Sequence, residues 1–238
     1  MPETTGPLTA EQLAAISKLD TPTIANALEE LNVRPRTEGF LRPEVRCISP
    51  VEGTVVGYAV TGLISARHRS PKALGRSDYW DAIVSIPAPR MVVLHDIDYP
   101  DSIGSYWGEV QGNTALGLGC VGAVTDGGVR DLKEAEEMGF PFWAREVMVS
   151  HGYVHALEFN VPIGIAGVLV RPGDLIAADI HGAIEIPIDV APKLPAVAKM
   201  LVERESIVIK AAQASDASPA TLAEAWGKAS KIGAEQTY

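Results

Sequence analysis

A glycine-rich stretch from Trp107 to Asp131 carries the residues best suited to chemistry in this chain. It begins with Trp-Gly-Glu, continues through small residues into an apolar segment at 121–124, and is predicted to break at Thr-Asp-Gly-Gly, residues 125–128. Arg130 and Asp131 follow directly. Glycines let backbone N–H groups approach a ligand closely because they carry no Cβ. An arginine binds carboxylates and an aspartate binds cations, so the stretch predicts a site for a small, anionic, oxygen-rich ligand.

The same residues also have purely structural interpretations. Asp131 can favour a helix start while Arg130 lies on the surface, and Asp126, before two glycines, is typical of a turn. Glu109 either orients bound water near the site or simply begins a helix. Trp107 is interpreted as a packing residue under the loop. Residue types alone leave both interpretations of Arg130 and Asp131 open.

The histidine and cysteine spacings do not predict a zinc site. His151 and His155 have the i, i+4 spacing of a helical metal pair, but the Gly-Tyr-Val between them favours strand or loop. Cys47 and Cys120 lie far apart without a CxxC partner, which predicts reduced, semi-buried thiols and no disulfide.

Composition restricts the class of protein. The chain has 238 residues, of which 47% are hydrophobic, and a formal net charge of −10. This length and apolar content predict one large domain with a buried core. The acidic balance argues against nucleic-acid binding, which needs a concentrated basic surface. The local basic run between Arg67 and Arg76 is interpreted as a solvated loop.

Targeting and membrane signals are missing from the sequence pattern. The first twenty residues have neither a basic region nor an apolar region of the kind that signal peptides carry. No apolar run of about 18 residues predicts a membrane span. The expected location is therefore cytoplasmic, with no membrane partner.

The elements that must position the site follow an alternating pattern, which predicts an α/β fold. Thr21 is predicted as a helix N-cap followed by proline, and Trp80 as part of the buried side of its helix. Residues 65–77 are predicted as a surface loop. Residues 1–212 are expected to form the α/β domain, and residues 213–238 a C-terminal helical extension. Predicted helices cover 9–18, 21–32, 78–85, 109–118, 132–138, 189–212 and 221–228; predicted strands cover 53–61, 90–96, 121–125, 142–145 and 153–160, with a β-meander over 167–186.

Seven segments share their order and residue pattern with one known family. These segments are Thr21–Leu28, Gly53–Thr61, Trp107–Glu109, Gly122–Asp131, Phe140–Arg145, Val161–Ile163 and Arg171–Asp179. The chain resembles the RraA-like family over roughly residues 9–210. That family includes the 4-hydroxy-4-methyl-2-oxoglutarate and 4-carboxy-4-hydroxy-2-oxoadipate aldolases and the regulator of ribonuclease E activity.

The resemblance implies a swivelling β/β/α-type single domain with helices at both ends, assembled as a homotrimer or as paired trimers (a hexamer) with active sites at subunit interfaces. It also implies that Asp131 binds Mg²⁺ or Mn²⁺, and that Arg130 binds the pyruvyl part of the substrate and the oxyanion that forms. The family pattern continues from this pair as Arg-Asp-x-x-Glu or Asp, and Glu134 matches its last residue. Glu205, or less favourably Glu203, is the candidate acid contributed by a neighbouring subunit.

A second part of the implied site lies upstream. The Gly-Glu-Leu-Leu-like loop whose amides bind the pyruvyl carboxylate corresponds to Gly108, Glu109, Val110 and Gln111, and Gln111 departs from the apolar residue of the family pattern. Further departures at His181 and Glu146, with the 65–77 loop, leave the substrate undetermined. His181 itself is interpreted as a surface turn residue.

The implied activity is that of a metal-dependent lyase that cleaves a 4-hydroxy-2-oxo acid to pyruvate and a carbonyl product, or decarboxylates oxaloacetate. A divalent metal bound by the 2-oxo oxygen and carboxylate stabilises the enolate common to both reactions, so no lysine Schiff base is needed. The alternative is a non-catalytic regulator that binds a ribonuclease. Methyl transfer ranks last, because no glycine-rich strand-to-helix turn with an acidic ribose partner is present.

Overall fold

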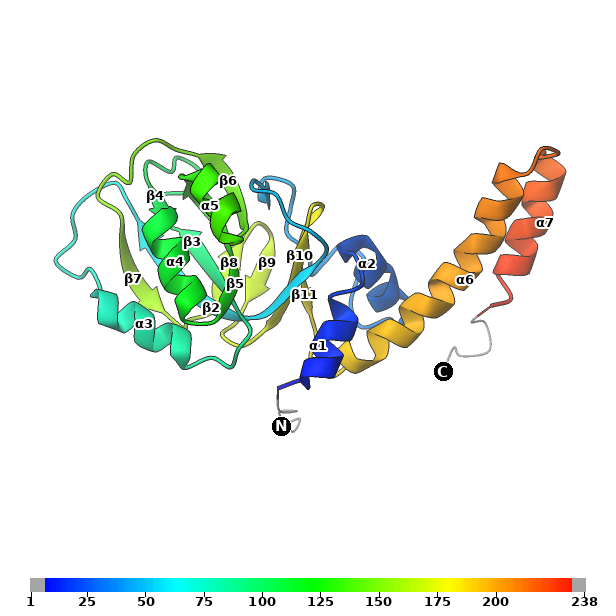
Figure 1. The fold of residues 1–238 in the computed structure, drawn as a ribbon, viewed down its shortest axis with the longest axis horizontal. Coiled ribbons are helices and arrows are strands. Elements are labelled where there is room, and N and C mark those ends of the chain that lie inside the picture. Colours follow the sequence, from blue (N-terminus) through cyan, green and yellow to red (C-terminus); the bar gives the residue numbers. More distant parts are fainter. Residues whose placement is uncertain (1–6, 233–238) are drawn as a thin grey trace.

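A mixed nine-stranded sheet organises the chain in the computed structural model, which describes residues 7–232 (Figure 1). The main strand order is β1-β6-β5-β3-β2-β10-β11, with β4 added to β5 and β7 added to β2, while β8 and β9 form a separate two-stranded sheet. The strands are β1 (Arg46–Cys47), β2 (Val55–Ser65), β3 (Arg90–Asp96), β4 (Ser105–Trp107), β5 (Cys120–Val129), β6 (Phe142–Val147), β7 (His155–Phe159), β8 (Ile163–Ile165), β9 (Val168–Val170), β10 (Leu175–Asp179) and β11 (Gly182–Ile186). The helices are α1 (Ala10–Ile16), α2 (Thr21–Glu30), α3 (Arg76–Val84), α4 (Glu109–Gly117), α5 (Leu132–Met138), α6 (Leu194–Gln213) and α7 (Pro219–Ala229), with a 3-10 helix at Ala191–Lys193.

The centre of the sheet is parallel. Strands β2, β3, β5 and β6 run side by side in one direction, and β4 also pairs in parallel with β5. Their apolar, β-branched sequences suit strands that are covered on both faces. Because parallel strands all end at the same edge, the loops after β3, β4 and β5 gather there.

Three apolar clusters hold the layers together. Helices α3, α4 and α5 pack on one face of the sheet, where Leu94 and Trp107 are fully buried, and the β8–β9 hairpin covers Val93 and Trp143 on the other face. The third cluster joins α1, α2 and the start of α6 to the β10–β11 end of the sheet. The candidate site lies on the α3–α4–α5 side.

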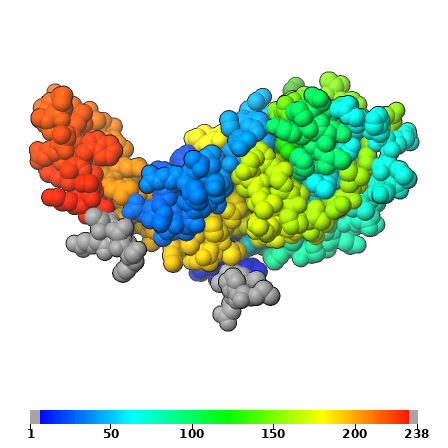
Figure 2. Space-filling view, turned by 180° about the vertical axis from the view of Figure 1, so that it is seen from behind, coloured from blue at the N-terminus to red at the C-terminus, as the bar shows by residue number. Residues whose placement is uncertain are grey.

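Helices α6 and α7 form an arm that projects away from the sheet (Figure 1). Figure 2 shows the arm, orange to red, standing apart from the body of the molecule at its C-terminal end. Near its start α6 is anchored by Leu194, Ala198 and Leu201, which are buried. Further along the arm, Ile209 of α6 and Trp226 of α7 are exposed. The arm includes α7, which belongs to the predicted C-terminal extension; residues 233–238 of that extension lie outside the described residues.

The predicted α/β class, with helices at both ends, is confirmed. Strand β3 and helix α5 have the predicted bounds, and Gly139 ends α5 in the left-handed conformation, with φ +66°. Trp107 is fully buried, as predicted. Cys47 and Cys120 are free thiols, as predicted, and burial raises the pKa of Cys120 to about 12.

Several local predictions are wrong. Residues 125–128 do not end the strand in a turn, because β5 continues through them to Val129. Asp126 is therefore a buried strand residue and not a turn former. Trp80 lies on the exposed side of α3. The predicted loop at 65–77 is shorter, since β2 includes Ser65 and α3 begins at Arg76.

The ends of three further elements also differ from prediction. The N-cap of α2 is Asp20, and Thr21 is its first helical residue. The predicted meander over 167–186 is split, because β9 pairs with β8 and β10 pairs with β2 and β11. Helix α6 begins at Leu194, later than predicted, after the 3-10 helix.

Thr21 and His181 belong to a junction between α2 and β10. The buried carboxylate of Asp179 accepts hydrogen bonds from the Thr21 backbone N–H and hydroxyl, both at 2.7 Å, and from the His181 N–H at 2.8 Å. Burial alone would raise the pKa of Asp179, but these hydrogen bonds outweigh it and lower the pKa. His181 is thus a turn residue at this junction, as predicted, and its side chain is half-exposed.

Among residues 7–232, every helix is too short or too polar to cross a lipid bilayer.

Candidate functional site

Two junctions, from β4 into α4 and from β5 into α5, lie side by side and form the candidate site. Strands β4 and β5 are parallel neighbours, and the Arg130 N–H donates to the Trp107 carbonyl at 3.1 Å. Each strand ends here and each helix begins here. The predicted segments 108–111 and 130–131 are therefore brought together.

Asp131 makes the turn from β5 into α5 in an unusual conformation. Its φ of 56° and ψ of 49° place it in the left-handed region, which few residues other than glycine adopt. Such conformations cost about 1–3 kcal/mol and cluster at functional sites. The Asp131 carboxylate does not cap its own helix; its Oδ2 accepts the Glu109 N–H at 3.0 Å. The conformation thus directs the carboxylate toward the start of α4.

Arg130 and Asp131 are in contact and partly open to solvent. Arg130 Nε lies 3.6 Å from Asp131 Oδ2, and the two side chains are 37% and 34% exposed. A cation and an anion are therefore presented together at the surface of one cleft, which is what binding a carboxylate next to a metal ion requires.

Gly108 permits this arrangement because a side chain there would collide with it. A Cβ on Gly108 would lie 2.5 Å from Asp131 Oδ2 and 3.3 Å from Arg130 Nε. Gly108 precedes α4, whose first three N–H groups have no partner inside the helix. The Glu109 N–H is taken by Asp131, which leaves the N–H groups of Val110 and Gln111 to bind a ligand.

These residues line a cleft of ≈ 600 Å³. The predicted residues that line it are Gly108, Glu109, Val110, Gln111, Arg130 and Asp131. The remaining lining residues come from α3, β4, α4 and the segment between β6 and β7: Arg76, Trp80, Ser105, Tyr106, Thr114, His151 and Val154. Sequence reasoning missed this second group. The basic run ending at Arg76 was the one available signal, and it was interpreted as a solvated loop.

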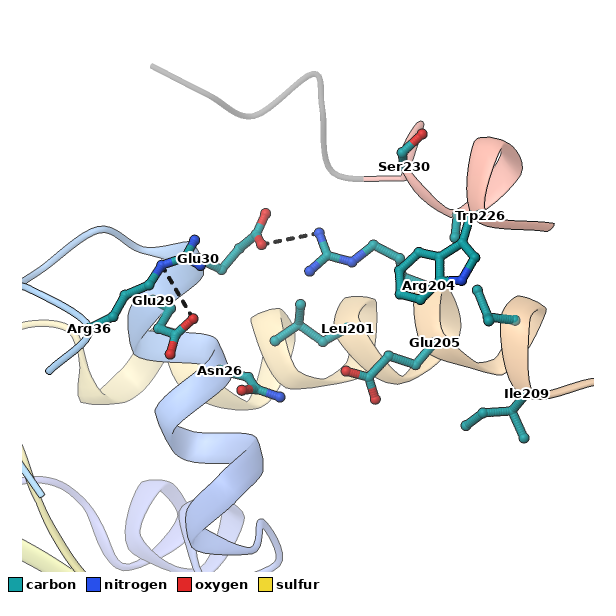
Figure 3. A pocket seen from close by; sticks show the side chains of 12 residues that line it. Asn26, Glu29, Glu30, Arg36, Leu201, Arg204, Glu205, Ile209, Trp226 and Ser230 are labelled. Atoms are coloured by element: carbon teal, nitrogen blue, oxygen red, sulfur yellow. Dashed lines mark hydrogen bonds and ion pairs between the residues drawn. The ribbon is translucent and has the colours of Figure 1, made fainter. Parts of the chain in front are cut away.

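Two glutamates that were predicted to belong to the site do not line this cleft within a single copy of the chain. Glu134 is exposed on α5, and it is not among the residues that line the cleft. Glu205 lines a different cleft, of ≈ 690 Å³, between α2 and the arm. Figure 3 shows Glu205 in that cleft with Asn26, beside the ion pairs Glu29–Arg36 and Glu30–Arg204. The prediction for Glu205 concerns a neighbouring subunit, so it stays a prediction.

The buried carboxylate of Asp126 pairs with the partly exposed His95 at the end of β5, and this pair was also missed. His95 Nδ1 donates to Asp126 Oδ2 at 2.6 Å, and the Asp96 N–H donates to Asp126 Oδ1 at 2.8 Å. The hydrogen bond to Asp126 raises the pKa of His95, against the lowering effect of burial. These bonds join β3 to β5 just beyond their last paired residues, Leu94 and Thr125. The polar sequence at the end of β3 was the signal for this network.

The residues of the cleft fit a divalent ion of the magnesium type. Mg²⁺ commonly binds one or two carboxylates and completes its shell with substrate oxygens and water. Asp131 offers a partly exposed carboxylate whose Oδ1 accepts no hydrogen bond from residues 7–232, and Glu109 lines the same cleft. Across the described part of the chain, no group of three or more His, Cys, Asp or Glu side chains is arranged to hold a metal by itself.

Comparison with known proteins finds a matching family model, a curated relative and related solved structures. The model of the RraA-like family, described as Aldolase/RraA, matches residues 21–184. A protein of Halalkalibacterium halodurans named "Putative 4-hydroxy-4-methyl-2-oxoglutarate aldolase" is 34% identical over 97 residues, which cover 39% of this chain and 46% of that protein. The chain thus spans about half the length of that curated relative.

Solved structures support the fold. An uncharacterized protein from Pseudomonas syringae pv. tomato is 24% identical, with a TM-score of 0.73 over 96% of this chain and 98% of that one. Streptomyces coelicolor RraAS2, described as an unusual member of the RNase ES inhibitor RraA protein family, is 21% identical, with a TM-score of 0.68 over 85% of this chain and 97% of that one. At these identities the similarity concerns the fold alone.

Proposed function

Because the chain belongs to the RraA-like family, which includes aldolases and ribonuclease inhibitors, we propose that it is a lyase that releases pyruvate from a 4-hydroxy-2-oxo acid. The observation that carries the proposal is the single cleft that presents the Arg130 guanidinium, the Asp131 carboxylate and the first N–H groups of α4. Decarboxylation of oxaloacetate is included, since it forms the same enolate.

Each group has a distinct role in this proposal. The N–H groups of Val110 and Gln111 bind the carboxylate next to the 2-oxo group, since helix N-termini favour anions. Arg130 would stabilise the negative charge that forms on the 2-oxo oxygen. Asp131 would hold Mg²⁺ or Mn²⁺, which when bound supplies Lewis-acid polarisation of the substrate.

The reaction requires an acceptor for the 4-hydroxyl proton. As that proton leaves, C4 becomes a carbonyl carbon, and the C3–C4 bond breaks with its electron pair moving to C3 and the 2-oxo oxygen. The enolate later takes a proton at C3 and becomes pyruvate. Glu109, which lines the cleft, and Glu205 of a neighbouring copy are the two candidate acceptors.

The proposal is tested by pyruvate release from 4-hydroxy-2-oxo acids and oxaloacetate with Mg²⁺ or Mn²⁺. We expect Asp131→Asn to lower kcat/KM by about 100- to 1000-fold, as is typical when a charge-stabilising group is lost. EDTA should abolish turnover, and Mn²⁺ should restore it. Glu137→Gln is the matched control, because Glu137 is an exposed carboxylate on α5 that does not line the cleft.

The regulator alternative makes the opposite prediction. A non-catalytic binder would release no pyruvate from any of these acids, and it would form a stable complex with a ribonuclease whether or not Asp131 is replaced. Turnover that is unaffected by both EDTA and Asp131→Asn would contradict the metal-dependent lyase.

A further inference from the structure

The cleft beside Arg130 and Asp131 has a second wall that the proposed chemistry does not use. This wall is formed by α3 and by the segment between β6 and β7. Arg76 and Trp80 come from α3, and His151 and Val154 come from the β6–β7 segment. The chemistry of this wall indicates what the cleft binds beyond the pyruvyl unit.

Arg76 and Trp80 are presented together by the geometry of α3. Residues four apart on a helix share one face, and both of these side chains line the cleft. Trp80 is 43% exposed, although its neighbours Tyr79 and Ile83 are buried in the core. The outer face of α3 thus offers an apolar surface next to a cation.

The charges of the cleft are distributed unevenly between its walls. Its two lining carboxylates, Glu109 and Asp131, both lie at the α4–α5 wall. Within residues 7–232, Arg76 forms neither an ion pair nor a side-chain hydrogen bond. Its guanidinium is therefore available for an anionic group of a ligand.

Other arginines of the same basic run are already engaged. Arg67 donates to the Asp101 carbonyl at 2.8 Å and lies 3.8 Å from Asp98 Oδ1. The Arg69 guanidinium stacks over the Tyr153 ring, 5.2 Å from its centroid. Neither residue lines the cleft, which distinguishes Arg76 from both.

We propose that Arg76 is the residue that binds the distal carboxylate of the substrate, so that a preference of the cleft for 2-oxo dicarboxylates over 2-oxo monocarboxylates depends on this side chain. A guanidinium binds a carboxylate through two parallel hydrogen bonds, which favours this anion over a neutral end group. Trp80 packs against the carbon chain between the two ends. The inference rests on the proposed function for the position of the 2-oxo end, at the α4 amides.

Two ligands of equal length isolate the effect of the distal carboxylate. 2-Oxoglutarate and 2-oxopentanoate both have five carbons and a 2-oxo acid end, and neither carries the 4-hydroxyl group that cleavage needs. Their Kd values are measured by calorimetry with Mg²⁺ present. We expect wild type to prefer 2-oxoglutarate, and Arg76→Gln to weaken 2-oxoglutarate binding by about 10-fold or more while changing 2-oxopentanoate binding by less than about 2-fold. Arg76→Lys should recover part of the preference.

Lys72→Gln is the matched control, because it removes a positive charge from the same exposed segment without lining the cleft. It should leave both Kd values unchanged. The inference is overturned if wild type shows no preference, if Arg76→Gln changes neither ligand, or if it weakens both equally.

The outcomes also separate this inference from the proposed function. If no 2-oxo acid is cleaved but the preference depends on Arg76, the lyase proposal fails and the binding inference stands. If pyruvate is released and the preference is insensitive to Arg76, the inference alone fails.

Discussion

Gly108 lies so close to Asp131 that the candidate site depends on the lack of a side chain at this residue. The nearest approach of a Cβ there, 2.5 Å from Asp131 Oδ2, is shorter than any ordinary contact. Because the same oxygen accepts the Glu109 N–H, moving it would disturb both the carboxylate and the start of α4.

Gly108→Ala should therefore damage catalysis more than folding. We expect kcat/KM for pyruvate release to fall by about 100-fold, the typical cost of displacing a reacting group by roughly 1 Å. Gly117→Ala, at the other end of α4, is the control, since a Cβ there meets no atom within 4 Å. That control should keep full activity, with stability unchanged or raised by up to about 1 kcal/mol. Equal activity of the two variants would contradict the proposed geometry.

His95 gives the protein a pH-dependent contribution to stability. Asp126 raises the pKa of His95 in the folded state, and Asp96 adds a smaller effect in the same direction. The raised pKa means that the protonated ring stabilises the fold at pH values below the unfolded pKa of about 6.5, and that this stabilisation is lost as pH rises through the folded pKa. His95→Gln should therefore lower the free energy of unfolding more at acidic than at alkaline pH.

Urea denaturation of wild type and His95→Gln on both sides of neutrality measures this difference. His68→Gln is the control, because His68 lies exposed in the loop after β2. A loss of stability in His95→Gln that is the same at every pH would show that the pair acts only through packing.

At the scale of the elements, periodic apolar patterns were sufficient to predict most helices and strands. The failure at 125–128 has a physical cause: its glycines are needed for tertiary contacts and not for a turn. A Cβ on Gly127 would lie 2.9 Å from Asp96 Oδ2, and one on Gly128 would lie 2.4 Å from Met148 Sδ. Neither partner is local in sequence, so a turn and a tightly packed strand look alike in the sequence.

The same limit applies to the candidate site. The α4–α5 wall of the cleft was predictable, because residues 108–111 and 130–131 lie within one continuous stretch that resembles the family pattern. The second wall, formed by α3 and the segment between β6 and β7, was not predictable. Arg76 and His151 reach the cleft from segments remote in sequence and have no periodic pattern of their own.

Helix α6 has one side packed on the body and another side open to solvent, and adjacent residues test this division. Leu201 is 3% exposed and packs in the cluster shared with α2, whereas Val202 is 57% exposed. We expect Leu201→Ala to lower the free energy of unfolding by about 2–5 kcal/mol and Val202→Ala by less than about 0.5 kcal/mol. Chemical denaturation of the two variants measures both values. Similar losses would mean that both sides of α6 are buried, as in a contact between copies.

At the scale of the whole molecule, the arm carries Glu205 away from the cleft that holds Arg130 and Asp131 (Figures 1 and 3). A role for Glu205 in catalysis therefore requires a second copy of the chain, as the predicted trimer or hexamer would supply.

Mixed assemblies test this requirement directly. Asp131→Asn and Glu205→Gln should each be nearly inactive alone. Co-assembly of the two should restore part of the activity, because some sites then combine an intact Asp131 from one copy with an intact Glu205 from another. Glu203→Gln tests the other candidate acid, and it should be active without a partner if Glu205 is the acid that acts. No recovery on mixing, with both single variants inactive, would place the two residues outside a shared site.

The parallel pairing of β4 and β5 also has an electrostatic consequence. It brings the positive ends of two helix dipoles to one place, on a protein whose formal net charge is −10. The dipoles act within about one helical turn, whereas the negative surface repels an approaching dianion over the Debye length, about 10 Å in 0.1 M salt. Attraction is thus short-ranged and repulsion long-ranged, so moderate salt should speed the encounter with a dicarboxylate instead of slowing it.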